Sequence, residues 1–182
     1  MHDHNVDLMV LTEHWLTPKD SAVKAEICPD GYSILVHERS DCRGGGTGLL
    51  YRDSYEASMI HSGVSEHGSF EYSEWLVKAS SYNFWVVVTY RPSYSDDHRV
   101  PISVFLSEFP EYLETVLLCK ELLLITGDFN IHVDDLQVSD TRKFLETLEA
   151  LGAEQHVDQT TPTHRDGHTL DLTITRILRA YS

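Results

Sequence analysis

Positive charge is scarce in this sequence, and long apolar segments are absent from it. Its 182 residues include 14 Lys and Arg against 29 Asp and Glu, which gives a formal net charge of −15 at neutral pH. Proteins bind nucleic acid through Lys and Arg that displace counterions from phosphates, so this charge disfavours direct contact with nucleic acid. It favours cations instead, divalent metals above all. No apolar run approaches the ~20 residues of a membrane-spanning helix, so we expect no membrane partner.

Cysteine is scarce as well. Cys28, Cys42 and Cys119 are widely spaced, odd in number and without a CxxC pair. We therefore expect free thiols in a reducing, intracellular compartment, with no disulfide partner and no zinc ribbon. Eleven histidines are scattered along the chain; His164 and His168 have i,i+4 spacing, but the Asp-Gly pair between them argues against a helix. We expect solvated histidines rather than metal ligands.

The remaining composition is that of a folded domain, because 41% of the residues are hydrophobic and 24% are charged. Apolar runs typical of strands occupy residues 6–11, 32–36, 49–52, 57–61, 74–79, 84–90 and 122–125. Helical stripes occupy residues 100–118, where Pro110 favours a kink or break, and residues 139–151. Residues 163–175 indicate two strand pieces around an Asp-Gly hairpin. We predict one α+β domain over residues 1–182.

Acidic side chains follow or interrupt three of these apolar runs. Glu13 follows the first, and Asp128 and Asn130 follow the run at 122–125. In an extended chain Asp128 and Asn130 face the same side. Asp171 lies among the aliphatic residues of the last strand, where a carboxylate needs a partner or a function. Together these residues predict a carboxylate-rich site for a hard cation such as Mg²⁺, which prefers oxygen ligands.

Each candidate also has a purely structural interpretation. Glu13 can cap a helix that starts near Trp15, and Asp128 can be a turn residue after a glycine. Tyr90 and Arg91 close the strand at 84–90, where both can hydrogen-bond phosphate oxygens or simply form a surface rim before a turn proline. The glycine run at 44–48 leads into a strand and has no Gly-Lys-Ser/Thr ending. We interpret it as a flexible hairpin or bulge rather than a phosphate loop.

Five segments occur in a recognisable order. They are Leu11-Thr12-Glu13-His14-Trp15-Leu16, Gly44-Gly45-Gly46-Thr47-Gly48-Leu49-Leu50-Tyr51, Thr89-Tyr90-Arg91-Pro92, Ile125-Thr126-Gly127-Asp128-Phe129-Asn130, and the stretch from Thr163 to Leu172. Taken together they resemble the endonuclease/exonuclease/phosphatase family. The resemblance is closest to the apurinic-type endonuclease domain of non-LTR (LINE-type) retrotransposon polyproteins, and it runs from the first residues almost to the last.

The resemblance implies a four-layered α/β sandwich, in which two β-sheets pack face to face and helices flank them. It also implies hydrolysis of a phosphoester with Mg²⁺ as the cofactor, Mn²⁺ being the alternative. By the same resemblance, Glu13 is a metal ligand, Asp128 orients or deprotonates the attacking water, and Asn130 holds the phosphate. Tyr90 stabilises charge in the transition state, with Arg91 beside it as a substrate-binding residue.

The resemblance also predicts that the domain is incomplete. Asp171 matches the family acid that pairs with a catalytic histidine and fixes its tautomer. In the family this histidine lies in a Ser-Asp-His stretch on a final strand, and a first strand carries an Asn that organises the metal. Neither stretch is present here, and His164 and His168 both precede Asp171. We therefore expect a sandwich lacking its first and last strands, with weak or no cleavage by this chain.

The leading hypothesis is a Mg²⁺-dependent phosphodiester hydrolase derived from a retrotransposon DNA endonuclease. It makes DNA the ancestral substrate and the nucleus the expected location. One alternative is a catalytically dead remnant that acts as a binding module, which the missing histidine and the −15 charge favour. The other is a phosphatase that acts on small phosphoesters.

Overall fold

The computed structural model describes residues 6–37 and 45–177 of the chain, which form two β-sheets and three helices. The strands are β1 (Leu8–Thr12), β2 (Tyr32–His37), β3 (Thr47–Arg52), β4 (Glu56–Val64), β5 (Glu71–Ala79), β6 (Tyr82–Tyr90), β7 (Leu122–Asp128), β8 (Ala153–Gln155) and β9 (Asp171–Arg176). The helices are α1 (Ser21–Ile27), α2 (Ile102–Val116) and α3 (Ser139–Ala150). Each apolar run that indicates a strand overlaps one of these strands.

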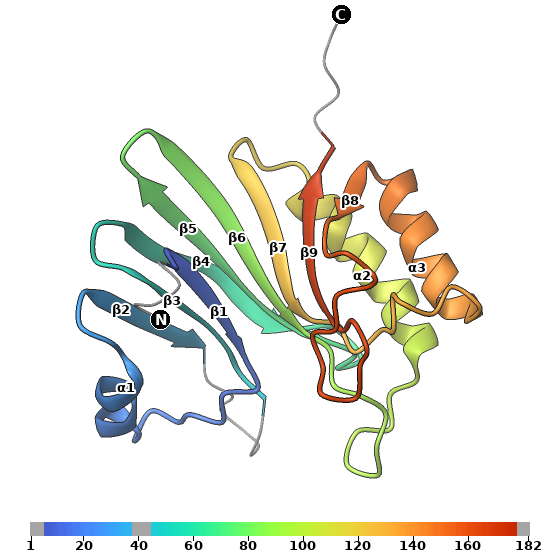
Figure 1. Ribbon diagram of the computed structural model, residues 1–182, viewed down its shortest axis with the longest axis horizontal. Coiled ribbons are helices and arrows are strands. Elements are labelled where there is room, and N and C mark those ends of the chain that lie inside the picture. The colour runs from blue at the N-terminus through green and yellow to red at the C-terminus, as the bar shows by residue number, and fades with distance from the viewer. Residues whose placement is uncertain (1–5, 38–44, 178–182) are drawn as a thin grey trace, which may run out of the picture.

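The two sheets pack face to face (Figure 1). The smaller sheet has the order β1-β3-β2 and the larger one β4-β5-β6-β7-β9-β8, and only the β6–β7 pair is parallel among the described strands. Leu49 and Tyr51 of the smaller sheet pack against Trp75, Val86 and Val88 of the larger sheet, and all five are buried. The predicted sandwich of two packed sheets flanked by helices is confirmed.

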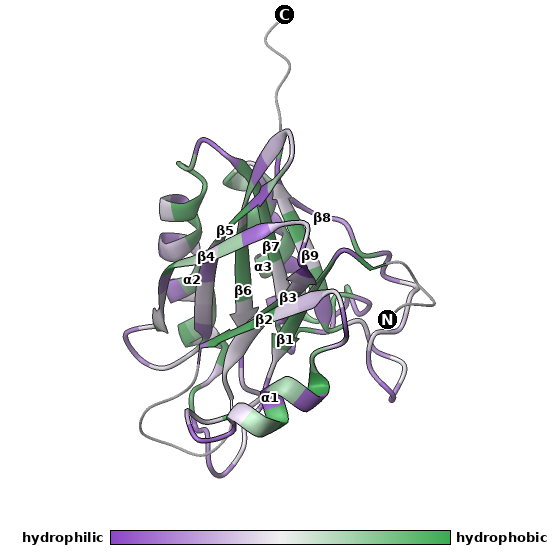
Figure 2. Ribbon diagram, turned by 90° about the vertical axis from the view of Figure 1, so that its left-hand side faces the viewer, coloured by the Kyte–Doolittle hydropathy of each residue, from purple (hydrophilic) through white to green (hydrophobic). Residues whose placement is uncertain are grey.

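Helices α2 and α3 cover the other face of the larger sheet (Figure 1). Their buried stripes meet alternate residues of β6 and β7, and the other alternate residues of β6 lie in the core between the sheets. Figure 2 shows green, hydrophobic stretches along the central strands of the larger sheet. The rings of Phe105, Phe109, Phe129 and Phe144 meet with centroids 4.9 to 6.3 Å apart. Full burial of each such ring contributes about 2–3 kcal/mol. This second core fills the helix-side face of the sheet, and the face toward the smaller sheet holds the first core.

Helix α2 runs without interruption through Pro110, where the sequence predicts a kink or break. A proline inside a helix removes one backbone hydrogen bond. Phe105, Phe109 and Leu113 lie on one buried stripe on both sides of the proline. Their packing holds the two halves of the helix on the same sheet, and it outweighs the lost bond. Helix α3 matches the predicted stripe closely and ends one residue earlier.

The predicted pair of strand pieces around Asp166-Gly167 is wrong, because only β9 forms there. Residues 163–168 make a tight turn in which the backbone N–H groups of Thr163 and His164 both donate to the carbonyl of His168. The Thr163 hydroxyl accepts hydrogen bonds from the N–H groups of Leu170 and Asp171, each at 2.9 Å. A side chain thus satisfies the backbone that a strand partner would otherwise satisfy.

The apolar patterns do not predict α1 or β8, which are short. Helix α1 buries none of its residues, so it has no apolar stripe that the sequence could reveal. Of the three cysteines, Cys28 and Cys119 are free thiols, as predicted, and Cys42 lies outside the described residues. None of the described helices is long and apolar enough to cross a membrane.

Candidate active site

Four polar residues form a row across four neighbouring strands. Glu71 on β5 pairs with Tyr90 on β6, Tyr90 pairs with Asp128 on β7, and Asp128 pairs with Asp171 on β9. Residues paired directly across a sheet project from the same face. That face is the one turned toward the smaller sheet, because Val88, two residues before Tyr90, lies in the core between the sheets. The row therefore points into the sandwich at the edge where β6 and β7 end and where β5 and β9 begin.

Glu13 reaches the same region from the smaller sheet. Strand β1 lies against β6 and β7, and Glu13 follows it immediately. The helix cap considered for Glu13 does not form, since its φ of 53° is left-handed and the first described helix begins at Ser21. The Glu13 N–H donates to the Gly46 carbonyl at 2.9 Å. A strained backbone held by tertiary contacts is typical of functional positions.

Gly45 and Gly46 hold this turn in place. The N–H of Gly46 donates to the Glu71 carboxylate at 3.0 Å, and Gly46 has a φ of 91°. A Cβ at Gly46 would lie 2.5 Å from the His14 ring, so only glycine fits. Gly46 thereby connects Glu13 to Glu71, a buried acid that the sequence patterns do not single out. Its only sequence signal is an acid at the start of the strand that follows Phe70.

Asp128 and Asn130 form one rigid turn at the end of β7. The backbone N–H of Asn130 donates to Asp128 Oδ1 at 2.9 Å, and Asn130 Nδ2 lies 3.2 Å from Asp128 Oδ2. Asn130 Nδ2 also donates to the Arg91 carbonyl at 2.7 Å. Asn130 has a φ of 49°, a region where Asn is tolerated better than most residues. Phe129 between them is fully buried against the helices.

The charges of the site act on Asp128. Burial above all, together with the nearby charges of Asp171 and Glu13, raises its pKa to about 6, against the opposing effects of the Asn130 N–H and Arg91. The carboxylates of Asp171 and Glu13 thus disfavour ionisation of Asp128, and the group carries a local excess of negative charge. Carboxylate and amide oxygens are the ligands that Mg²⁺ prefers, so the donor set suits a hard divalent cation.

Asp171 lies at the exposed end of this group. Burial of its carboxyl raises its pKa, whereas a hydrogen bond from the Thr163 hydroxyl and the charge of His164 lower it. His164 Nδ1 is itself 3.5 Å from Asp166 Oδ2. Among the described residues, the side chain of Thr163 bonds both the backbone N–H and the carboxyl of Asp171, and no histidine bonds that carboxyl.

Arg91 does not accompany Tyr90 into the site. Consecutive residues of an extended segment point to opposite faces. The Arg91 guanidinium lies over the Phe105 ring, 5.7 Å from its centroid, and the residue is only 6% exposed. Burial lowers the pKa of Arg91, and the charges of Asp128 and Asp140 oppose that shift. Arg91 meets the site through its backbone, since its N–H donates to the Asp128 carbonyl at 2.9 Å and its own carbonyl holds Asn130.

Comparison with known proteins agrees with this architecture. The sequence model of the Endonuclease/Exonuclease/phosphatase family matches residues 1–177. No curated protein matches the chain in sequence.

Several solved structures share the fold at low identity. The human Nocturnin catalytic domain with bound sulfate is 15% identical with a TM-score of 0.61, over 95% of this chain and 70% of that one. D. rerio TDP2 complexed with single strand DNA product is 13% identical with a TM-score of 0.58, over 100% and 75%. The Bacteroides thetaiotaomicron mannosyl-6-phosphatase is 15% identical with a TM-score of 0.60, over 96% and 73%.

Proposed function

The chain belongs to the endonuclease/exonuclease/phosphatase family, and on that premise we propose that it is a Mg²⁺-dependent phosphodiester hydrolase. One observation supports this proposal most strongly. Asp128 and Asp171 are directly paired across β7 and β9, in one row with Tyr90, and β1 delivers Glu13 to the same edge. Like charges paired across strands destabilise a sheet, so such an arrangement requires a function that uses them.

The proposed metal ligand is Glu13, at the open rim of the acidic group. Its side chain is exposed, and Asp128 lies within the reach of its charge. Mg²⁺ is the proposed cofactor, and Mn²⁺ is the alternative with the same preference for oxygen. When bound, such an ion neutralises charge on a phosphate and lowers the pKa of water.

The protein's own groups have distinct proposed roles. Asp128 orients the attacking water and accepts its proton, and a carboxyl with a pKa of about 6 is suited to that role near neutral pH. The Asn130 amide donates to the Arg91 carbonyl and to the Asp128 carboxylate, and it holds the phosphate by exchanging the longer bond, the one to Asp128, for a bond to a phosphate oxygen. The Tyr90 hydroxyl stabilises charge in the transition state. Asp171 matches the acid that would orient a histidine, and among the described residues no histidine bonds its carboxyl. We propose that Arg91 contributes by positioning Asn130, in place of the expected side-chain contact with phosphate.

We propose DNA as the substrate, following the resemblance to retrotransposon endonucleases, with a nuclear location as its corollary. Trp15 supports a nucleic-acid substrate, because it is 57% exposed and lies two residues after Glu13 with a φ of 58°. An exposed aromatic ring held in place by its backbone can stack on a base. A surface with a net charge of −15 repels phosphates, so the bound cation would have to mediate the contact.

A plasmid-nicking assay tests the proposal. Supercoiled plasmid is incubated with the chain in Mg²⁺, in Mn²⁺ and in excess chelator, and the same assay is run with Asp128→Ala and with an exposed-surface control, Glu114→Gln. The proposal expects metal-dependent nicking that Asp128→Ala reduces by about 10²–10⁴-fold, the usual contribution of a general base. Nicking that survives in chelator, or that Asp128→Ala leaves unchanged, contradicts it.

Two alternatives have specific support. The absence of a histidine on the Asp171 carboxyl, among the described residues, favours a binding remnant that takes up Mg²⁺ without turnover. The net charge favours a small phosphoester over DNA, and a mannosyl-6-phosphatase has the same fold. Mg²⁺ binding without hydrolysis of plasmid or sugar phosphate identifies the remnant. Release of phosphate from a sugar phosphate, with the plasmid intact, identifies the phosphatase.

A further inference from the structure

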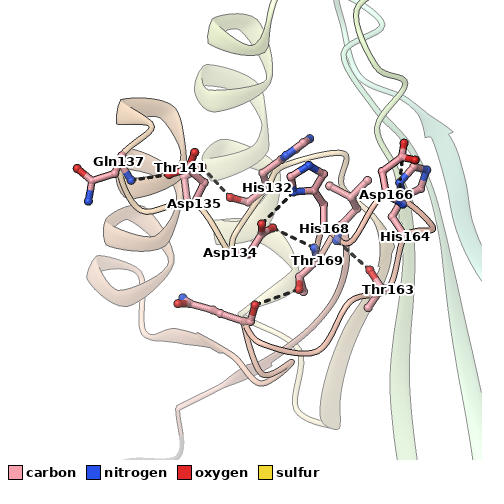
Figure 3. A network of polar contacts seen from close by, with 12 residues as sticks. His132, Asp134, Asp135, Gln137, Thr141, Thr163, His164, Asp166, His168 and Thr169 are labelled. Atoms are coloured by element: carbon pink, nitrogen blue, oxygen red, sulfur yellow. Dashed lines mark hydrogen bonds and ion pairs between the residues drawn. The ribbon is translucent and has the colours of Figure 1, made fainter.

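A second group of possible metal ligands lies beside the acidic site but is separate from it. His132, Asp134 and His168 each offer one ligand atom, and these atoms all lie within 4.8 Å of one another. The two imidazole rings are 4.0 Å apart between centroids, and His168 Nδ1 lies 2.9 Å from Asp134 Oδ2 (Figure 3). In a tetrahedral zinc site with bonds of about 2.0–2.1 Å, ligand atoms are about 3.3 Å apart. Small rotations of the side chains are therefore enough to surround an ion.

The backbone of residues 131–135, which carries His132 and Asp134, is held by burial and by hydrogen bonds. Ile131 and Val133 are buried on either side of His132, so their packing turns the intervening side chain outward. The His132 carbonyl accepts hydrogen bonds from the Asp135 N–H at 3.0 Å and from the Thr141 hydroxyl at 3.1 Å. The segment is thereby tied to the first turn of α3.

The backbone around His168 is also held by burial and by hydrogen bonds. Thr169, next to His168, is fully buried, and its hydroxyl donates to the Thr161 carbonyl at 2.8 Å. The Thr169 N–H donates to Asp134 Oδ1 at 3.0 Å, so one oxygen of Asp134 is oriented by the backbone while the other faces His168. Figure 3 shows these contacts converging between the two loops. Preorganised ligands with oriented carboxylates are what metal sites require.

The chemistry of this group differs from that of the acidic site. Two imidazoles and one carboxylate suit borderline transition-metal ions such as Zn²⁺, whereas Mg²⁺ prefers oxygen ligands alone. Three protein ligands leave a coordination position open to water. His132 is exposed and the other two ligands are half-buried, so an ion can enter from solvent.

We propose that His132, Asp134 and His168 bind one transition-metal dication, with Zn²⁺ as the ion of choice. The ion cross-links the segment that leaves β7 with the segment that enters β9. These segments carry Asn130 and Asp171 respectively, so the ion fixes the spacing of the loops on either side of the acidic site. This inference does not depend on the proposed hydrolase activity.

Zinc titration of the metal-stripped chain tests the proposal. Calorimetry with Zn²⁺ alone is performed in a His2→Ala/His4→Ala background, which removes two further histidines of the sequence that can bind the ion. We expect one equivalent to bind, and Co²⁺ at the same site to give the visible absorption of a low-symmetry N/O site. His132→Ala is the first variant because its imidazole is exposed, and it should weaken binding by at least tenfold, as should His168→Ala.

Two controls separate this site from its neighbours. His164→Ala removes a histidine of the same loop that pairs with Asp166, and it should leave zinc binding unchanged. Asp128→Asn should also leave the zinc stoichiometry unchanged, and millimolar Mg²⁺ should not displace the zinc. Circular dichroism confirms the fold of each variant before titration. The proposal is overturned by absence of zinc binding, or by binding that folded His132→Ala and His168→Ala variants retain, since the group would then be a simple Asp134–His168 ion pair.

Discussion

Asp128 and Asp171 lie directly opposite each other on the antiparallel strands β7 and β9. Opposed carboxylates at such a position repel each other. The Arg91 guanidinium lies over the Phe105 ring, and no salt bridge among the described residues joins the two carboxylates. The fold therefore stores an electrostatic cost at one edge of the sheet. A bound divalent cation would remove this cost. Protonation of one carboxylate, or its replacement by an amide, would remove it as well.

We first predict that Asp128→Asn stabilises the metal-free chain at neutral pH. The folded-state pKa of Asp128 is about 6, above the ordinary 3.8, so this group favours folding when protonated. Its contribution is fully present below about pH 3.8 and is lost as the pH rises through about 6. A shift of about two units corresponds to about 3 kcal/mol, which we discount to about 1–2 kcal/mol for partial exposure.

Urea unfolding at pH 5 and pH 7.5 measures this effect. The stability difference between variant and wild type should be larger at pH 7.5, and taking that difference removes the background titration of the histidines. Mg²⁺ should stabilise the wild type and should stabilise Asp128→Asn much less. A variant that is less stable than the wild type at both pH values would contradict the electrostatic account.

We next predict that Trp15→Ala weakens binding of nucleic acid without altering hydrolysis of a small phosphoester. Loss of one stacked base costs about 1–3 kcal/mol, so KM for DNA should rise about tenfold or more while kcat changes little. Tyr82→Ala is the matched control, because Tyr82 is 63% exposed at the opposite end of β6 from Tyr90. Equal effects of the two substitutions would mean that Trp15 is not a stacking platform.

Much of the fold is predictable from the sequence because the spacing of its apolar residues indicates which positions are buried. The run from Phe84 to Tyr90 is apolar on both faces and becomes the central strand β6 between two cores. Glu13, Asp128 and Asp171 are predictable as a group because a carboxylate beside or within an apolar strand requires a partner or a function. The limits appear where contacts are set by tertiary geometry. For example, the face of the sheet from which the Arg91 side chain projects depends on the residue at which β6 ends.

The histidine cluster shows the same limit in another form. His164 and His168 look like a solvated pair by spacing, and His132 lies more than thirty residues earlier in the chain. Only the pairing of β7 with β9 brings His132 and His168 together. The turn at 163–168 cannot be predicted from strand propensity either. The Thr163 hydroxyl accepts the backbone hydrogen bonds that a neighbouring strand would otherwise accept.

We further predict that Glu108→Gln destabilises the chain at pH 6. Burial raises the pKa of Glu108, but hydrogen bonds from Ser69, Ser65 and His67 prevail and lower it to about 2. Its contribution to stability is therefore present above its ordinary pKa of 4.5 and is lost as the pH falls toward 2. Loss of charged hydrogen bonds, among them the His67 N–H at 2.7 Å, should cost about 1–3 kcal/mol.

The measurement is urea unfolding of the variant and wild type at several pH values. The difference should be full at pH 6 and should narrow below pH 4.5. Glu114→Gln on the same helix is exposed and should stay within about 0.5 kcal/mol of the wild type. A difference that is constant from pH 6 to pH 3 would show that the carboxylate charge is not responsible.

Finally, we predict that Gly127→Ala prevents stable folding of the acidic edge. A Cβ at Gly127 would lie 2.0 Å from the Thr89 carbonyl oxygen on β6, and its φ is 143°. The clash is with backbone, so relief requires β6 and β7 to separate at the Thr89–Gly127 pair, next to the pair of Tyr90 and Asp128. Gly31→Ala is the matched control, because Gly31 has a φ of 80° and nothing within 4 Å of its added Cβ. Gly31→Ala introduces backbone strain alone and should lower the free energy of unfolding by about 1 kcal/mol. Gly127→Ala should lower it by more than about 3 kcal/mol and should abolish stabilisation by Mg²⁺. Thermal unfolding of both variants with and without Mg²⁺ decides the matter, since equal losses would show that strain alone, and not the close approach of the two strands, requires glycine at position 127.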